Sequence, residues 1–162
     1  MPLLDLDKFV NALAPRARLL GLDVGSKTIG LAIADSAFTI ASPLETIRRT
    51  KFTADAVVLE RVIREREIGG LIVGLPVNMD GSEGPRCQSV RQFARNLLER
   101  IDLPLAFWDE RLSTMAVTRT LIEADMSRKR RGEVVDKMAA SFILQGALDY
   151  LRNHPAPPGE SH

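Results

Sequence analysis

The distances between apolar runs restrict the fold more than any other feature of this sequence. The first run, Arg18–Val24, is followed after the tight turn Gly25-Ser26-Lys27 by a second run, Ile29–Asp35. A link this short joins the two strands as an antiparallel pair. The later apolar runs are separated by helical segments, and strands that are connected through a helix pair in parallel. The sequence therefore predicts an α/β fold with a mixed sheet.

Three more strands and a set of helices complete the predicted architecture. The short apolar run Gly70–Leu75, which is bounded by glycines and followed by Pro76, is typical of a buried parallel strand. A weaker third strand is predicted at Leu44–Arg49, and a fifth at Leu105–Trp108. Helices are predicted at Leu3–Leu13, about Ala54–Glu67, about Arg86–Ile101, from Ser113 or Thr114 to about Ala124, and about Glu133–Arg152. We expect a mixed five-stranded sheet, its first three strands antiparallel and its last two parallel, with helices on both faces.

The 162 residues are predicted to form one globular domain with short additions at both ends. At 45% hydrophobic residues, the chain is long and apolar enough to bury a core. Residues 1–16 are expected to form an N-terminal helical extension, 17–152 the domain itself, and 153–162, with three prolines, a disordered tail. We expect a cytoplasmic protein, because no apolar run reaches the length of a membrane span and the N-terminus lacks a signal pattern.

The composition excludes several classes of chemistry. The 22 Lys and Arg residues against 21 acids give a nearly neutral chain, so any nucleic-acid contact must come from a local patch. The single cysteine, Cys87, excludes an internal disulfide and a Cys-rich zinc motif. Both histidines, His154 and His162, lie near the C-terminal end, which argues against a Ser-His-Asp triad. Catalysis, if present, is therefore expected to depend on carboxylates.

Asp23 is the first such carboxylate, because it stands near the end of an apolar strand. Burial of a charge is costly unless a partner such as a metal ion compensates it. Gly21, Gly25 and Gly30 around it would let the backbone approach a ligand closely or adopt positive φ. The alternative, which this segment alone leaves equally favoured, is an aspartate that caps the turn through its own side chain.

Further acids are expected at the same edge of the sheet, since ligands in open α/β sheets bind outside the carboxyl ends of the parallel strands. Asp80 lies in the loop after the fourth strand, Asp109 and Glu110 follow the fifth, and Asp136 stands in the first turn of the predicted last helix. Clustered carboxylates raise one another's pKa unless a divalent cation neutralises them. Oxygen ligands favour Mg²⁺ or Mn²⁺, and two such ions roughly 3.5–4 Å apart can promote phosphodiester hydrolysis.

Each of these features also has a structural interpretation. Asp109 and Glu110 could simply begin a turn, and Asp136 would favour a helix N-terminus whatever else it does. The loop Gly74–Ser82 could be an ordinary connection, although a backbone beside a helix N-terminus is also a phosphate site. The basic run Arg128–Arg131 belongs to a loop predicted at Ser127–Gly132. Its closeness to Asp136 makes a phosphate contact more plausible than for an isolated charge run.

Four motifs, in this order, resemble the YqgF/RuvX family over about Arg18 to Leu151. They are Gly21-Leu22-Asp23-Val24-Gly25-Ser26-Lys27 with Ile29-Gly30, Gly74-Leu75-Pro76 with Asn78-Met79-Asp80-Gly81, Asp109-Glu110-Arg111-Leu112-Ser113-Thr114, and Asp136-Lys137-Met138-Ala139-Ala140. The resemblance implies an RNase H-like fold and a nuclease that trims the 5′ end of pre-16S rRNA during ribosome maturation. Branched-DNA cleavage, as in Holliday-junction resolvases, is also implied.

The resemblance also implies roles for individual residues. Asp23 would be the acid that bridges the metals, Glu110 the second acid and Asp136 the third, with Asp109 and Asp80 as competitors for the second position. Phosphates would be contacted by Lys27, Arg111, Arg128, Lys129, Arg130 and Arg131. Thr28 stands where the family often has arginine, so Lys27 or Arg111 would make the contact expected of that arginine.

Two alternatives stay beside the rRNA nuclease, and a third is rejected. A junction resolvase would use the same site on four-way DNA and would act as a homodimer. A non-catalytic RNA-binding assembly factor, for example on a ribosomal particle, would keep the fold without the chemistry. An actin-like ATPase shares a similar first hairpin but needs a second such domain, for which this chain is too short. A monomer or homodimer that binds no membrane is expected.

Overall fold

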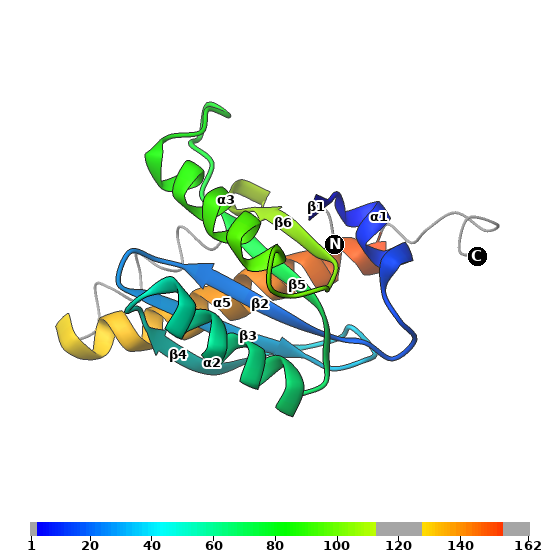
Figure 1. Ribbon diagram of the computed structural model, residues 1–162. Coiled ribbons are helices and arrows are strands. Elements are labelled where there is room, and N and C mark those ends of the chain that lie inside the picture. The colour runs from blue at the N-terminus through cyan, green and yellow to red at the C-terminus, as the bar shows by residue number, and fades with distance from the viewer. Residues whose placement is uncertain (1–2, 113–127, 154–162) are drawn as a thin grey trace.

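The computed structural model describes residues 3–112 and 128–153, with side chains described for residues 5–112 and 138–153. A mixed sheet forms its centre, with the strand order β1-β6-β5-β2-β3-β4 (Figure 1). The strands are β1 (Leu3–Leu4), β2 (Arg18–Val24), β3 (Thr28–Ala34), β4 (Ala41–Arg48), β5 (Ile68–Leu75) and β6 (Leu105–Asp109). The helices are α1 (Leu6–Ala12), α2 (Phe52–Glu65), α3 (Pro85–Leu98), the 3₁₀ turn η1 (Glu110–Leu112) and α5 (Arg128–Asn153).

The predicted five-stranded mixed sheet is confirmed as strands β2 to β6. Strands β2, β3 and β4 pair antiparallel, and β5 pairs in parallel with both β2 and β6. The turn that joins β2 to β3 is closed by a 2.8 Å hydrogen bond from the Gly25 amide to the Thr28 carbonyl. The crossovers through α2 and α3 provide the chain length that parallel pairing requires.

The first residues depart from the single helix predicted at Leu3–Leu13. Leu3–Leu4 instead forms β1, a short sixth strand parallel to β6. Helix α1 begins only at Leu6 because Asp5 caps it, its carboxylate accepting a 2.9 Å hydrogen bond from the Lys8 amide. Phe9 of this helix is fully buried.

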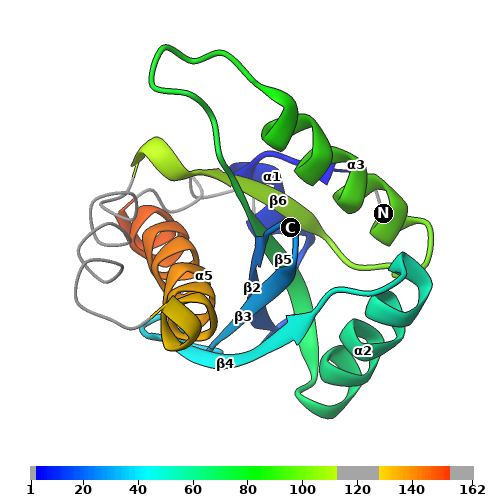
Figure 2. The same cartoon turned by 90° about the vertical axis from the view of Figure 1, so that its left-hand side faces the viewer.

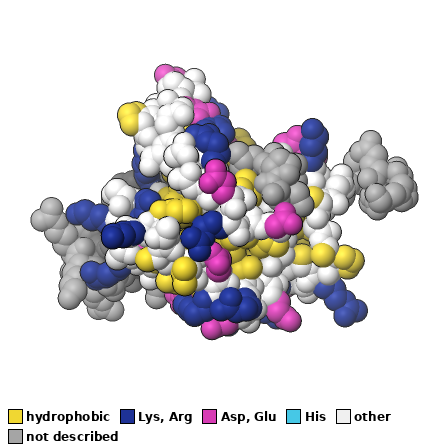
Figure 3. Space-filling model, in the orientation of Figure 1, with side chains coloured by type: hydrophobic (Ala, Val, Ile, Leu, Met, Phe, Trp, Pro, Cys, Tyr) yellow, Lys and Arg dark blue, Asp and Glu magenta, His cyan; other side chains and the backbone are white. Residues whose placement is uncertain are grey.

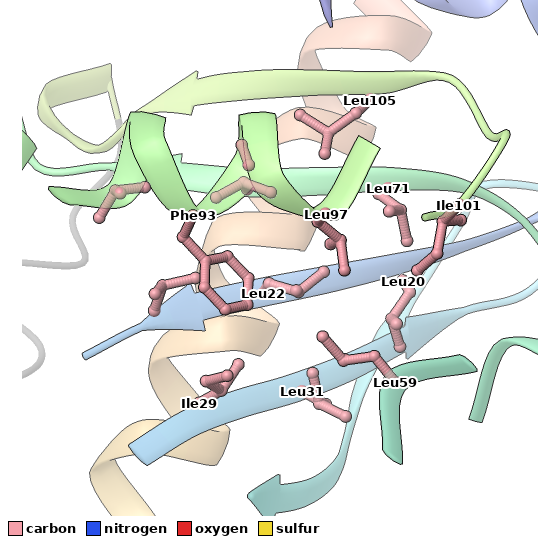
Figure 4. Close-up of a cluster of buried hydrophobic side chains, with 14 of the residues drawn as sticks. Leu20, Leu22, Ile29, Leu31, Leu59, Leu71, Phe93, Leu97, Ile101 and Leu105 are labelled. Carbon is pink, nitrogen blue, oxygen red and sulfur yellow. The ribbon is translucent and has the colours of Figure 1, made fainter. Parts of the chain in front are cut away.

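Two hydrophobic clusters hold the helices against opposite faces of the sheet, as the view along the sheet shows (Figure 2). Helices α2 and α3 cover one face over a cluster that includes Leu22, Leu59, Phe93 and Leu97 (Figure 4). Helix α5 covers the other face over a smaller cluster. Alternate residues of each strand enter alternate clusters, because successive side chains of a strand point to opposite faces. No helix in the described part of the chain combines the length and apolarity needed to cross a membrane.

Helix α5 begins earlier than the sequence predicts. Its first residue is Arg128, so the expected basic loop Arg128–Arg131 is helical, and the prediction of a loop there is wrong. Asp136 consequently lies in the third turn of α5 rather than in its first. Gly132, which separates the basic run from the predicted helix start, does not interrupt the helix, and the arginines and lysine before it are good helix formers. The helix predicted from Ser113 or Thr114 to Ala124 and the tail after Asn153 lie outside the described residues.

Candidate functional site

Asp23 lies near the carboxyl end of β2, on the face of the sheet that α5 covers. Gly21 is two residues earlier and therefore points to the same face. A Cβ atom at Gly21 would lie 2.8 Å from Cβ of Leu144 and 3.1 Å from the carbonyl oxygen of Ala140, both in α5. The Asp23 side chain is only 3% exposed. A charged group is thus held in the interior, at the edge where the parallel strands end.

Glu110 is a second buried acid at this edge, 8% exposed at the start of η1. Trp108, two residues earlier, points toward α5, where its indole ring lies against Gly146. Gly74 of β5 is paired with Trp108, and so lies between β2 and β6. Among the described residues, the buried charged side chains are Asp23, Asp55 and Glu110. Asp23 lies near the end of β2 and Glu110 directly follows β6, and these two strands flank β5 in the sheet.

Asp109, the neighbour of Glu110, is held differently. It alternates with Trp108 and therefore points to the α2–α3 face. Its carboxylate accepts hydrogen bonds from the guanidinium of Arg111, the shortest 2.7 Å from Nη2, and a 2.9 Å bond from the Arg111 amide. These bonds lower the pKa of the Asp109 carboxyl. Asp109 is thus a partner of Arg111.

Asp80 is exposed and belongs to its own loop. Oδ1 accepts a 2.9 Å bond from the Ser82 amide and a 2.6 Å bond from the Ser82 hydroxyl, which lower the pKa of the carboxyl. Gly81 has a φ of 92°, which a residue with a side chain rarely adopts. Nη1 of Arg111 would lie 3.5 Å from a Cβ at this position, so the loop after β5 lies beside η1.

Asp136 is described only through its backbone, and its side chain lies outside the described residues. It is one helical turn before Ala140, which lies against Gly21 together with Leu144. Residues four apart share a helical face. Figure 1 shows the N-terminal part of α5 beside the carboxyl end of β2. The fold thus brings position 136 to the same edge of the sheet as Asp23.

The chemistry of these acids fits a divalent cation. Asp23 and Glu110 offer carboxylate oxygens from a region with little water, and hard cations such as Mg²⁺ and Mn²⁺ prefer oxygen ligands. Within the ranges whose side chains are described, no group of three or more His, Cys, Asp or Glu residues is close enough to hold a metal ion. A complete ligand set therefore needs a residue outside those ranges.

The cations predicted to contact phosphates occupy different environments. Lys27 is exposed in the β2–β3 turn, whereas the guanidinium of Arg111 is hydrogen-bonded to Asp109. Residues Arg128, Lys129, Arg130 and Arg131 form the first turn of α5, and their side chains lie outside the described residues. On the face shown in Figure 3, basic side chains are interspersed with acidic ones, and apolar side chains are visible between α2 and α3.

Arg86 is a cation that the sequence analysis did not single out. It lies in the first turn of α3, and its Nη2 is 3.9 Å from Oδ1 of Asp23. The sequence did hold a signal for this residue, because a positive charge in the first turn of a predicted helix opposes the helix dipole. Such a charge indicates that an acidic partner lies nearby.

The glycines near Asp23 serve packing and turn geometry in this structure. The space at Gly21 is taken by α5, and a Cβ at Gly25 would lie 3.0 Å from the carbonyl oxygen of Thr28. Among the described glycines, the one with positive φ is Gly81. The absence of a side chain at Gly21 therefore makes room for α5, and not for a ligand as the sequence suggested.

The chain matches the family described as "RuvX: Holliday junction resolvase" over residues 17–150. A protein of Paramagnetospirillum magneticum, named "Putative pre-16S rRNA nuclease", is 64% identical over 92% of this chain and 96% of its own length. A protein of Rhodospirillum centenum with the same name is 59% identical over 99% of this chain and 88% of its own length.

Solved structures show the same fold at low sequence identity. RuvC of Thermus thermophilus, in complex with a Holliday-junction substrate, has a TM-score of 0.54 and 13% identity over 88% of this chain and 99% of RuvC. A second structure of Thermus thermophilus RuvC has a TM-score of 0.50 and 10% identity, over 84% of this chain and 97% of that protein. The fold is therefore RNase H-like, and by sequence the chain belongs to the RuvX/YqgF family.

Proposed function

We propose that this protein is a metal-dependent endonuclease that processes the 5′ end of pre-16S rRNA during ribosome maturation in the cytoplasm. The observation that carries the proposal is the burial of Asp23 and Glu110 at the carboxyl edge of the parallel strands. Acidic side chains are almost never fully buried unless something pairs with them, so two buried acids at one edge of a sheet indicate a functional site. The relatives named as pre-16S rRNA nucleases support rRNA as the substrate.

Asp23, Glu110 and Asp136 would hold the cation, Mg²⁺ or Mn²⁺. Such an ion supplies Lewis-acid activation for phosphodiester hydrolysis by water. The residues of the chain contribute in three ways. Asp23 and Glu110 keep negative charge fixed in a region of low dielectric, which strengthens their attraction for a cation. Position 136 approaches from α5, because that helix packs directly on Gly21. Lys27, Arg111 and the Arg128–Arg131 turn would contact the phosphates of the RNA.

The test compares three variants of the proposed acids with one matched control. We expect Asp23→Asn, Glu110→Gln and Asp136→Asn each to lower metal-dependent cleavage of a precursor rRNA fragment by about 10²-fold or more, as for loss of a major electrostatic contribution to catalysis. Asp109→Asn is the control, because it changes the adjacent carboxylate that Arg111 holds. It is expected to keep cleavage within about tenfold, a limit of 1.4 kcal/mol in transition-state binding.

Two outcomes would refute this assignment. Full activity of Asp23→Asn would exclude the proposed site. Loss of activity in Asp109→Asn, with full activity in Glu110→Gln, would show that Asp109 and not Glu110 is the second acid. RNA binding that survives chelation and loss of all three acids, without any cleavage, would instead identify a non-catalytic assembly factor.

A second candidate is cleavage of branched DNA, which the description of the matching family favours. The same purified protein would be incubated with a precursor rRNA fragment and a four-way DNA junction at equal concentrations. Symmetric cuts in the junction by a dimer, with intact rRNA, would establish a resolvase. Cleavage of the rRNA alone would establish the first function.

A further inference from the structure

Arg86 forms an ion pair with Asp23, one of the proposed catalytic acids. The N–O distance of 3.9 Å to Asp23 is within ion-pair range but beyond a hydrogen bond. Asp23 is 3% exposed and Arg86 is 52% exposed, so the pair joins a fixed buried charge to a solvated, movable one. The guanidinium therefore lies against Asp23 without being locked to it.

The position of Arg86 in its helix is unfavourable unless an anion is near. Helix α3 has no acidic residue in its first turn, and the N-cap Gly84 provides no side-chain hydrogen bond. A positive charge at this end opposes the helix dipole. The nearby arginines of α3 are engaged otherwise: Arg91 is hydrogen-bonded to Glu83, and Arg95 to Gln92. Arg86 is directed instead toward the acidic edge.

A divalent cation and the Arg86 guanidinium would compete for the single negative charge of Asp23. A divalent cation that binds Asp23 would repel the guanidinium, since like charges this close cost free energy. The displaced side chain would remain tethered at the start of α3, beside the edge of the sheet that carries the acids. A guanidinium there can bind a phosphate oxygen with two parallel hydrogen bonds, which a lysine cannot reproduce.

We propose that Arg86 is an exchangeable counter-ion. It neutralises Asp23 in the metal-free protein, and it binds a phosphate of the RNA once a divalent cation occupies the acids. This inference rests on the proposed function, because it requires the cation and the nucleic acid at this edge. It adds a substrate-binding residue, and it gives the buried Asp23 carboxylate a positive charge nearby before the metal arrives.

The test measures two equilibria that should change in opposite directions. In Arg86→Gln, the dissociation constant for Mn²⁺, measured by calorimetry on the protein alone, is expected to fall about two- to fivefold, as for loss of a partly exposed ion pair. The dissociation constant for a catalytically blocked RNA in Ca²⁺ is expected to rise, and the slope of its salt dependence to fall by about one phosphate contact. Arg86→Lys should keep the wild-type Mn²⁺ affinity and recover only part of the RNA affinity.

Arg95→Gln is the matched control, because it removes the same charge from the same helix about 13 Å farther along. Its two dissociation constants should stay within about twofold of wild type, and all variants should unfold at similar urea concentrations. If Arg86→Gln behaves like Arg95→Gln in either measurement, the inference is wrong. A wild-type protein that binds Mn²⁺ through Asp23 and cleaves RNA would then leave the proposed function intact. If Mn²⁺ affinity is the same in wild type and Asp23→Asn, the proposed metal site fails, and the inference with it.

Discussion

Helix α5 packs so closely on Gly74 that a larger residue at this position should lower the stability of the protein. Gly74 lies in β5 beside the proposed acids, and a Cβ atom there would overlap Cδ1 of Ile143 and lie 2.9 Å from its Cγ1. Ile143 is fully buried, so it has little space into which to move. Gly74→Ala should therefore push α5 away from the sheet.

The expected magnitude follows from two opposing effects. Adding a methyl group to a filled core costs about 1–3 kcal/mol. Replacing glycine by alanine lowers the entropy of the unfolded chain and returns about 0.4–1 kcal/mol. Taken at the middle of both ranges, the net result is a loss of about 1 kcal/mol in the free energy of unfolding. Ile143→Ala removes all three atoms nearest to the new methyl group, and alone should cost about 2–5 kcal/mol.

Equilibrium unfolding in urea, followed by far-UV circular dichroism, measures all four members of this double-mutant cycle. In the Ile143→Ala background, Gly74→Ala should become neutral or stabilising, so the two changes should couple by at least about 1 kcal/mol. The reasoning is refuted if Gly74→Ala leaves the wild-type protein equally stable or more stable. A loss that persists unchanged in the Ile143→Ala background would also refute it, since the clash with Ile143 would not be the cause.

Three further predictions concern buried or hydrogen-bonded groups away from the proposed acids. Asp55→Ala should cost about 1–3 kcal/mol in urea unfolding, because the buried Asp55 carboxylate accepts a 3.1 Å bond from the Thr50 amide; an unchanged midpoint would contradict this. Hydrogen bonds from Arg91 lower the pKa of Glu83 from 4.5 to about 2. A lowered pKa stabilises the fold above the unfolded-state value, so the stability difference between wild type and Glu83→Gln should be present at neutral pH and disappear as the pH falls from about 4.5 to about 2. A difference that does not depend on pH would exclude the charge as its cause. Burial, with a contribution from Glu83, raises the pKa of Cys87 to about 11, so a thiol reagent at pH about 8 should react with Cys87 only after unfolding. Rapid reaction of the folded protein would show that Cys87 is accessible.

The sheet was predictable because its pairing depends on local information. The tight turn after Val24 allows only an antiparallel partner, and the helices around Gly70–Leu75 impose parallel pairing. The strand β1 was not predictable in this way. Its two residues, Leu3 and Leu4, pair with β6 about a hundred residues later in the chain, and their apolar spacing also fits a helix.

The start of α5 shows a second limit of local reasoning. Arg128 to Arg131 have the composition of a solvated loop, but arginine and lysine are also good helix formers. The helix extends through them, and Asp136 moves from the first turn to the third. Asp136 is therefore too far from the helix N-terminus to gain the favourable interaction with the helix dipole that the sequence predicted.

The positions of the candidate acids along the chain were predictable, but their contacts were not. The apolar runs and their links were enough to predict that Asp23, Asp109 and Glu110 stand where parallel strands end, because they define the strands and their directions. They could not predict that Asp109 is hydrogen-bonded to Arg111 while Glu110 is buried. Nor could they predict that Arg86 approaches Asp23 from a helix that begins far later in the chain. Those relations depend on the phase of each strand and on the docking of distant helices. Only tertiary packing fixes them, because the contacts that decide them are made between segments that are remote in the chain.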